Sequence, residues 1–155
     1  MKNADVIIIS PGVPLTIAGI KEAKRKKVSV ISELELAVRE IKKPMIAVTG
    51  TNGKTTTTAL AGHILTECKI PNCVGGNIGT ALTDLIEEAN RADWVVVEVS
   101  SFQLETTPSL SPKIGALLNV TPDHLDRHSS FDEYLNIKLK LFDMLGRTGS
   151  VCTML

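Results

Sequence analysis

A short glycine loop between an apolar run and a helical pattern holds the residues with the clearest chemistry. The loop Gly50–Thr55 (GTNGKT) follows Met45–Thr49 and precedes a threonine-rich stretch. A strand, a glycine loop, Lys-Thr and a helix together form a phosphate-binding loop, in which backbone N–H groups and the helix N-terminus face phosphate oxygens. Lys54, expected to be exposed, supplies a positive charge, and the Thr55 hydroxyl can reach Mg²⁺. The residues predicted to bind phosphate are Gly50, Thr51, Asn52, Gly53, Lys54, Thr55 and Thr56. The alternative is a tight turn before a helix.

A carboxylate stands near the end of another apolar run. Glu98 lies in the strand predicted for Trp94–Val99 and is followed by Ser100–Glu105 (SSFQLE). Ligands of open parallel sheets bind at the carboxyl ends of strands, so we expect Glu98 to face the same crevice as the phosphate loop. Mg²⁺ prefers oxygen ligands and usually takes one or two carboxylates. Glu98 is therefore a candidate magnesium ligand, and the alternative is a surface glutamate at a strand end.

A histidine follows the strand predicted for Gly115–Val120. Residues 119–126 (NVTPDHLD) again place polar groups at a carboxyl end. His124 is a candidate metal ligand or general acid/base. The alternative is that Asp123 or Thr121 caps a turn and His124 is merely nearby. The residues alone favour neither interpretation.

Lys138 falls in the middle of the apolar face of the helix predicted for Phe131–Leu145. At about 100° per residue, apolar side chains surround it on the helical wheel: Phe131, Tyr134, Leu135, Leu141, Phe142 and Leu145. Burial would favour the neutral amine. A neutral amine can act as a nucleophile, or can react with CO₂ to give a carbamate that binds metal. The alternative is a snorkelling lysine whose stem covers the core.

Apolar runs and helical patterns alternate along the chain. Strands are predicted at Val6–Ile9, Val28–Ile31, Met45–Thr49, Trp94–Val99 and Gly115–Val120, each apolar on both faces. Helices are predicted at Ile17–Lys26, Glu33–Glu40, Thr55–Glu67, Ala81–Ala89 and Phe131–Leu145. This alternation predicts an α/β fold with a parallel sheet. Lys42-Lys43-Pro44 is a plausible boundary, and the two strands before it either pack on the rest or are the remnant of a larger domain.

Composition limits the function classes. The chain has 155 residues, 43% apolar residues and a formal net charge of zero, which gives no electrostatic case for binding nucleic acid or an anionic membrane. Three cysteines without metal-ligand spacing, and no visible signal peptide, indicate a cytoplasmic protein. No apolar run is long enough to span a bilayer, so no membrane insertion is expected.

Two further loops are weak signals by themselves. They are Gly75–Gly79 (GGNIG), which contains Asn77 and follows a possible short strand, and Ser10–Gly12 (SPG). Taken in order, however, the runs TGTNGKTT, GGNIG, EVSSFQLE, NVTPDHLDRH and YLNIKLKLF resemble the Mur ligases of bacterial peptidoglycan synthesis. The resemblance covers about residues 4–145, and the short phosphate loop fits that family. Within the family, Ser100–Glu105 is similar to the members that add D-glutamate.

This resemblance implies an ATP-dependent amide ligase. ATP would phosphorylate the carboxylate of UDP-N-acetylmuramoyl-L-alanine, and the amine of D-glutamate would attack the acyl phosphate. Lys54 and Thr55 would hold the phosphates and one Mg²⁺, with Glu98 as a ligand of that ion. His124 and a carbamylated Lys138 would bind a second Mg²⁺. The resemblance also implies that Asn77, Ser10, Pro11 and Gly12 contact the UDP-muramoyl substrate.

The same resemblance implies an incomplete protein. Residues 1–43 look like the C-terminal part of a Rossmann-like domain that binds the UDP-substrate, and residues 44–155 like an incomplete ATP-binding central domain, a three-layer parallel sheet of the phosphate-loop type. Gly146–Leu155 is expected to form a loop with at most one short strand, outside the family match. We expect such a piece to be inactive alone. The alternatives are a nucleotide- or metal-binding remnant without catalysis, or another amide ligase of the Mur/folylpolyglutamate synthase superfamily.

Overall fold

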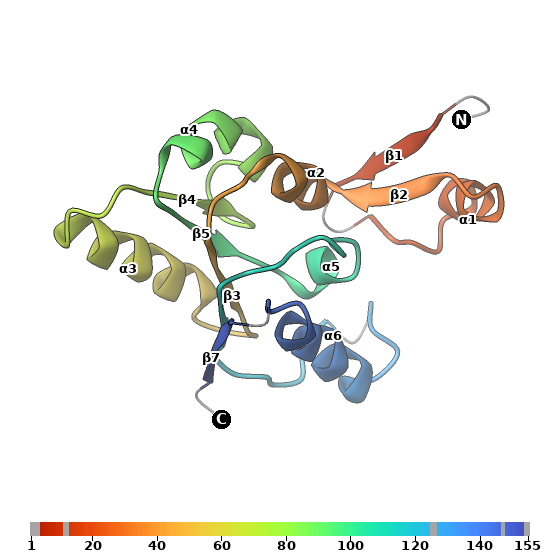
Figure 1. Ribbon diagram of the computed structural model, residues 1–155. Coiled ribbons are helices and arrows are strands. Elements are labelled where there is room, and N and C mark those ends of the chain that lie inside the picture. Colours follow the sequence, from red (N-terminus) through yellow and green to blue (C-terminus); the bar gives the residue numbers. More distant parts are fainter. Residues whose placement is uncertain (1–3, 11–12, 125–126, 147, 154–155) are drawn as a thin grey trace.

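A five-stranded parallel sheet forms the centre of the molecule (Figure 1). The computed structural model describes residues 4–10, 13–124, 127–146 and 148–153. The strands lie in the order β4-β5-β3-β6-β7. Their bounds are β3 (Met45–Thr49), β4 (Asn72–Gly76), β5 (Trp94–Glu98), β6 (Ile114–Leu117) and β7 (Ser150–Thr153). Every neighbouring pair is parallel, which confirms the predicted α/β fold.

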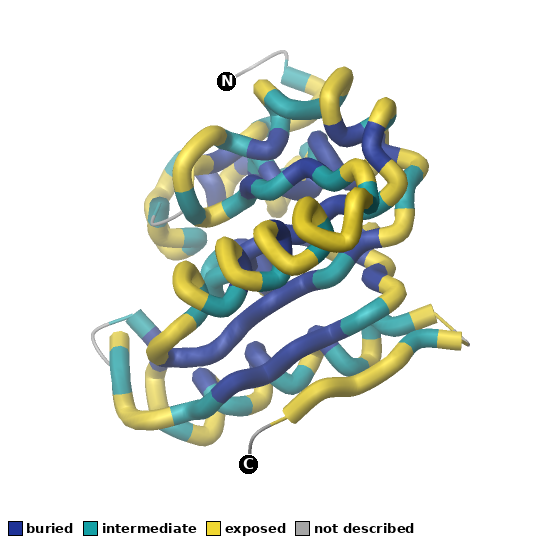
Figure 2. Tube along the Cα trace, turned by 90° about the vertical axis from the view of Figure 1, so that its left-hand side faces the viewer, coloured by how far each residue is buried: buried dark blue, intermediate teal, exposed yellow. Residues whose placement is uncertain are grey.

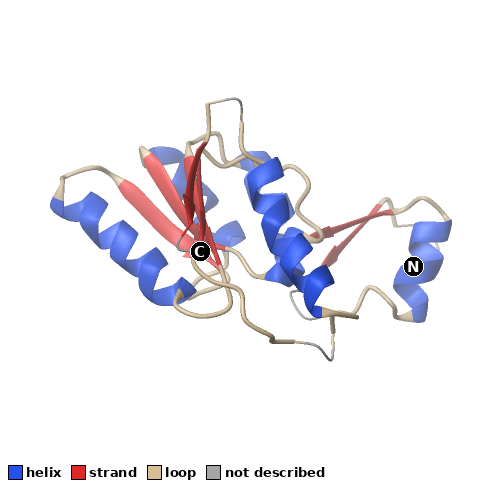
Figure 3. Ribbon diagram, turned by 90° about the horizontal axis from the view of Figure 1, so that it is seen from below, coloured by secondary structure: helices blue, strands red, loops and turns tan. Residues whose placement is uncertain are grey.

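Helices cover both faces of this sheet, giving three layers (Figure 3). On one face lies α3 (Lys54–Glu67), packed closely because an added Cβ at Gly62 would stand 2.4 Å from Val74. On the other face lie α2 (Glu33–Glu40), α5 (Ser101–Leu104) and α6 (Phe131–Asp143), which share one apolar core with the strands. Alternate strand residues point to opposite faces, so both faces of β3 are apolar.

A second, two-stranded parallel sheet stands beside the first (Figure 1). It pairs β1 (Val6–Ile9) with β2 (Ser29–Ser32), and α1 (Ala18–Arg25) connects them. A strand that is apolar on both faces is expected to be covered on both faces. This expectation is wrong for β1, because Val6 is 41% and Ile8 48% exposed. The helix after this sheet, α2, packs instead into the core of the larger sheet. The last helix of the first segment thus packs on the rest of the chain, and the interpretation of residues 1–43 as the remnant of a larger domain stays a prediction.

Several elements differ in detail from the predicted ones. The helix predicted at 81–89 is a 3-10 turn, η1 (Leu82–Leu85), followed by α4 (Ile86–Arg91). The last stretch holds one short strand, β7, which pairs with β6 and is exposed along its whole length (Figure 2). Within the described ranges, no helix combines the length and the apolar character needed to cross a membrane.

Candidate functional site

Strand order brings the predicted site segments together. β3 lies between β5 and β6, and the register pairs Val48 with Glu98 and Thr49 with Leu117. The carboxyl ends of these three strands therefore meet at one edge of the sheet. The phosphate loop leaves β3, Glu98 ends β5, and Asn119 follows β6 at this edge. The expected meeting of these segments at the carboxyl ends of the strands is confirmed.

The phosphate loop turns sharply into α3. Gly50 has a φ of 153° and Gly53 a φ of 81°, values that favour glycine. The N–H of Thr57 donates to the carbonyl of Gly53 (2.9 Å), whereas the N–H groups of residues 54–56 precede this turn at the positive end of the helix dipole. Lys54 is half-buried rather than exposed, because its Nζ donates to the carbonyl of Thr51 (2.8 Å).

Both carboxylate oxygens of Glu98 are hydrogen-bonded. Thr55 Oγ1 donates to Oε2 (2.8 Å), and Asn77 Nδ2 donates to Oε1 (2.8 Å). Glu98 is only 1% exposed, so the alternative of a surface glutamate is wrong. Asn77 is held there by its own backbone N–H, which donates to the carbonyl of Glu98 (2.9 Å). A carboxylate beside a hydroxyl, at the mouth of a phosphate loop, is an oxygen donor set that suits Mg²⁺.

Lys138 is buried with its amine on the phosphate loop. It is 1% exposed, and its Nζ donates to the carbonyl of Gly50 (2.8 Å) and lies 4.5 Å from the ring centroid of Tyr134. The alternative of a snorkelling lysine is therefore wrong. Burial first, and then repulsion by Lys54, lower the pKa of Lys138 to about 8, although Asp123 opposes the shift. Only a minor fraction of this amine is therefore neutral at neutral pH, although this fraction is far larger than for an ordinary lysine.

His124 lies beside the same aromatic ring but is exposed. The backbone φ of His124 is 53°, and its backbone N–H donates to Asp123 Oδ1 (2.8 Å). The centroid of its imidazole ring lies 6.4 Å from that of the Tyr134 ring. Among the described residues, no three His, Cys, Asp or Glu side chains form a group that could hold a metal. Lys138 as an amine donates a hydrogen bond and offers no anionic oxygen. The pairing of His124 with Lys138 as ligands of a second ion therefore stays a prediction.

A second histidine, His128, was not singled out by the sequence pattern. It is 3% exposed, its Nε2 lies 3.1 Å from Ser101 Oγ, and its ring stacks on Phe102 with 5.3 Å between centroids. Burial lowers its pKa, which favours the neutral ring. The sequence gives little indication that His128 is buried, because His128 lies in a polar stretch without apolar periodicity.

The predicted substrate loop is only partly described. Pro11 and Gly12 lie outside the described residues, and Ser10 is exposed after β1. A small cavity between this loop and α5 is lined by Ser10, Phe102 and Arg127, among others. Phe102 also contacts His124, with 5.2 Å between ring centroids. Ser10 and His124 thus each lie near Phe102, whereas Asn77 bonds to Glu98.

Comparison with known proteins gives a family and several relatives. The sequence model of the Mur ligase middle domain matches residues 48–154, so residues 146–154 belong to the matched region, contrary to the prediction from the sequence. UDP-N-acetylmuramoylalanine–D-glutamate ligase of Geotalea daltonii is 51% identical over 140 residues, which are 90% of this chain and 31% of that protein. The enzyme of the same name from Pelotomaculum thermopropionicum is 48% identical over 141 residues, 91% of this chain and 31% of that protein. The chain thus spans about a third of the length of these relatives.

Two solved structures share the fold. The MurF ligase from Thermotoga maritima in complex with ADP superposes with a TM-score of 0.63 at 17% identity, covering 97% of this chain and 43% of that one. The UDP-N-acetylmuramate-alanine ligase MurC from the same organism gives a TM-score of 0.55 at 28% identity, covering 96% of this chain and 35% of that one.

Proposed function

This chain belongs to the Mur ligase family, and we propose that it carries the phosphate-binding part of an ATP-dependent ligase that joins D-glutamate to UDP-N-acetylmuramoyl-L-alanine in cytoplasmic peptidoglycan synthesis. The relatives of that name support the two substrates, and the ADP bound to the related MurF ligase supports the nucleotide. Neither nucleic acid nor membrane insertion has a part in this function. The chain spans about a third of the length of those relatives, so the complete reaction is proposed for the whole ligase.

The loop and Glu98 act on the nucleotide. The N–H groups at the start of α3 and the Lys54 ammonium bind phosphate oxygens, which neutralises charge as a carboxylate approaches the triphosphate. The substrate carboxylate attacks the γ-phosphorus and ADP leaves. The amine of D-glutamate then attacks the acyl carbon, the phosphate group departs, and an amide bond remains. Thr55 and Glu98 would hold one Mg²⁺, which supplies further charge neutralisation when bound.

Lys138 and His124 have proposed roles on the other side of the loop. A neutral, buried Lys138 amine can add to CO₂ and lose a proton, which gives an anionic carbamate with oxygen donors. That carbamate and His124 would hold a second Mg²⁺ in the assembled enzyme. Ser10 and Asn77, with Pro11 and Gly12, would contact the UDP-muramoyl substrate. Each of these roles comes from the family resemblance and from the positions of the residues around the loop.

One observation carries the proposal: the Thr55 hydroxyl lies 2.8 Å from a fully buried Glu98 carboxylate at the start of the phosphate loop. The test is a chimera in which the matching region of the Geotalea daltonii relative is replaced by this chain. We expect ADP release that requires both UDP-N-acetylmuramoyl-L-alanine and D-glutamate, and that is lost in the Lys54→Ala chimera. A folded chimera that releases ADP equally without D-glutamate, or with other amino acids, would contradict the assignment.

A second candidate function is nucleotide binding without catalysis. It is favoured by the Lys138 amine, which bonds to Gly50 instead of offering a metal ligand. The chimera separates the two functions, because a binding remnant would bind Mg·ADP and form no product.

A further inference from the structure

Asn119, just beyond β6, pairs with the backbone of the phosphate loop. The N–H of Asn52 donates to Asn119 Oδ1 (2.9 Å), and Asn119 Nδ2 donates to the carbonyl of Asn52 (3.0 Å). The carbonyl of Asn119 accepts a further bond from the N–H of Thr51 (3.0 Å). Asn119 thus bonds to the loop as a neighbouring strand would, at a point where neither segment is a strand.

Other contacts fix the same half of the loop. An added Cβ on Gly50 would lie 3.2 Å from Leu118 Cβ and 3.3 Å from the carbonyl of Asn119, so the loop rests directly on this segment. Thr51 is 8% exposed, and its Oγ1 accepts from the N–H of Thr121 (3.1 Å). Residues 50–52 are therefore bound to the segment after β6. Thr51 and Asn52 are among the residues predicted to bind phosphate, but their backbone N–H groups already donate to Asn119. The N–H groups of residues 53–56 therefore remain to donate hydrogen bonds to phosphate.

We infer that Asn119 is a positioning residue for the phosphate loop, and this inference rests on the proposed nucleotide binding. By holding residues 50–52, it keeps the N–H groups of residues 53–56 in their binding arrangement before the nucleotide arrives. A glycine-containing loop has many conformations, and ordering it on binding weakens affinity. The apparent dissociation constant rises in inverse proportion to the fraction of molecules in the competent conformation.

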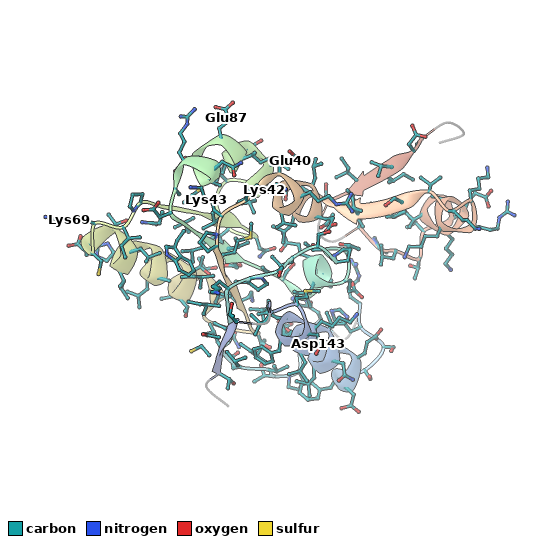
Figure 4. The ribbon with its side chains drawn as sticks, viewed as in Figure 1. Glu40, Lys42, Lys43, Lys69, Glu87 and Asp143 are labelled. Carbon is teal, nitrogen blue, oxygen red and sulfur yellow. The ribbon has the colours of Figure 1, made fainter. Side chains whose placement is uncertain are left out.

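The chain contains a matched control for this residue. Asn90 makes the same type of paired backbone contact, since Lys42 N–H donates to its Oδ1 (3.0 Å) and its Nδ2 donates to the carbonyl of Glu40 (3.1 Å). Glu40 and Lys42 lie at the end of the molecule away from α6 and the phosphate loop (Figure 4). Asn90→Ala therefore removes two equivalent hydrogen bonds without touching the loop.

The experiment measures binding of Mg·ADP to the 155-residue chain by calorimetry. We expect Asn119→Ala to raise the dissociation constant about tenfold, and Asn90→Ala to change it less than about twofold, with similar losses of stability in both. Equal affinity in wild type and Asn119→Ala, or equal weakening in both variants, would overturn the inference, because the effect would then be absent or merely structural.

Amide hydrogen exchange without nucleotide tests the inference independently of binding. Exchange at residues 50–57 should accelerate in Asn119→Ala and stay unchanged in Asn90→Ala; equal exchange would overturn the positioning role. If the wild-type chain does not bind Mg·ADP, the proposed nucleotide binding is wrong. The exchange rates at residues 50–57 in the two variants would still show whether Asn119 holds the loop. If Asn119→Ala does not fold, Asn119→Asp replaces it, because Asp keeps the acceptor for Asn52 N–H and loses the donor to its carbonyl.

Discussion

Replacing Lys138 with methionine should change how the stability of the chain depends on pH. The amine is buried and has a pKa of about 8, compared with 10.5 for an ordinary lysine. Since each pKa unit corresponds to about 1.4 kcal/mol, keeping this amine charged in the folded state costs about 3 kcal/mol. Lys138→Met removes this cost at every pH, because methionine fills the space with an apolar, adaptable side chain.

The direction of the effect follows from proton binding. The folded pKa lies below the unfolded pKa, so between about pH 8 and 10.5 the unfolded chain binds more protons and the free energy of unfolding rises with pH. Below that window both states are protonated and the cost is constant. The cost is about 3 kcal/mol at about pH 7 and about 1 kcal/mol at about pH 9.5, so wild type should gain about 2 kcal/mol relative to Lys138→Met between these two pH values.

The assay is urea unfolding of both proteins at these two pH values in CO₂-free buffer, which prevents carbamate formation. The variant also loses the hydrogen bond to Gly50, which lowers its free energy of unfolding by the same amount at both pH values. This contribution therefore cancels when the results at the two pH values are compared. Lys140→Met is the control, since Lys140 lies on the same helix and is exposed. A wild-type minus Lys138→Met difference that is equal at both pH values would refute the reasoning about the buried amine.

Three further predictions concern the rest of the site. Lys54→Met should weaken Mg·ADP binding about 100-fold while changing the free energy of unfolding by less than about 1 kcal/mol, because the folded state loses the hydrogen bond from the Lys54 ammonium to the carbonyl of Thr51. Unchanged calorimetric affinity would contradict the phosphate role of Lys54. Glu98→Gln should shift the Mg²⁺ titration of ADP binding to higher concentration and cost about 1–3 kcal/mol of stability, since both carboxylate oxygens accept hydrogen bonds. Glu35→Gln is its control, a buried carboxylate bonded to Ser109 and Arg39, and should lose stability without moving that titration. Wild type should lose stability relative to His128→Asn as the pH falls below about 6.5, because burial lowers the folded pKa of His128 and charging it disfavours the folded state; parallel acid-unfolding curves would contradict this.

Local sequence determined the elements that carry the chemistry. The strand before the phosphate loop and the helix after it follow from an apolar run, glycines that permit positive φ and a threonine-rich helical stretch. The burial of Lys138 was also predictable, because helical periodicity alone places it among apolar neighbours. Such signals extend over a few residues, so a linear sequence displays them fully.

Tertiary structure decided which of these residues meet, and with what partners. The strand order 4-5-3-6-7 puts Glu98 beside Thr55 and Asn119 beside Asn52, although each pair is more than 40 residues apart in the chain. The same packing buries His128, although its sequence stretch is polar, and leaves β1 exposed to solvent, although its sequence is apolar. Sequence periodicity reports which face of an element is apolar, whereas the contacts of that face depend on how distant elements are arranged around the sheet.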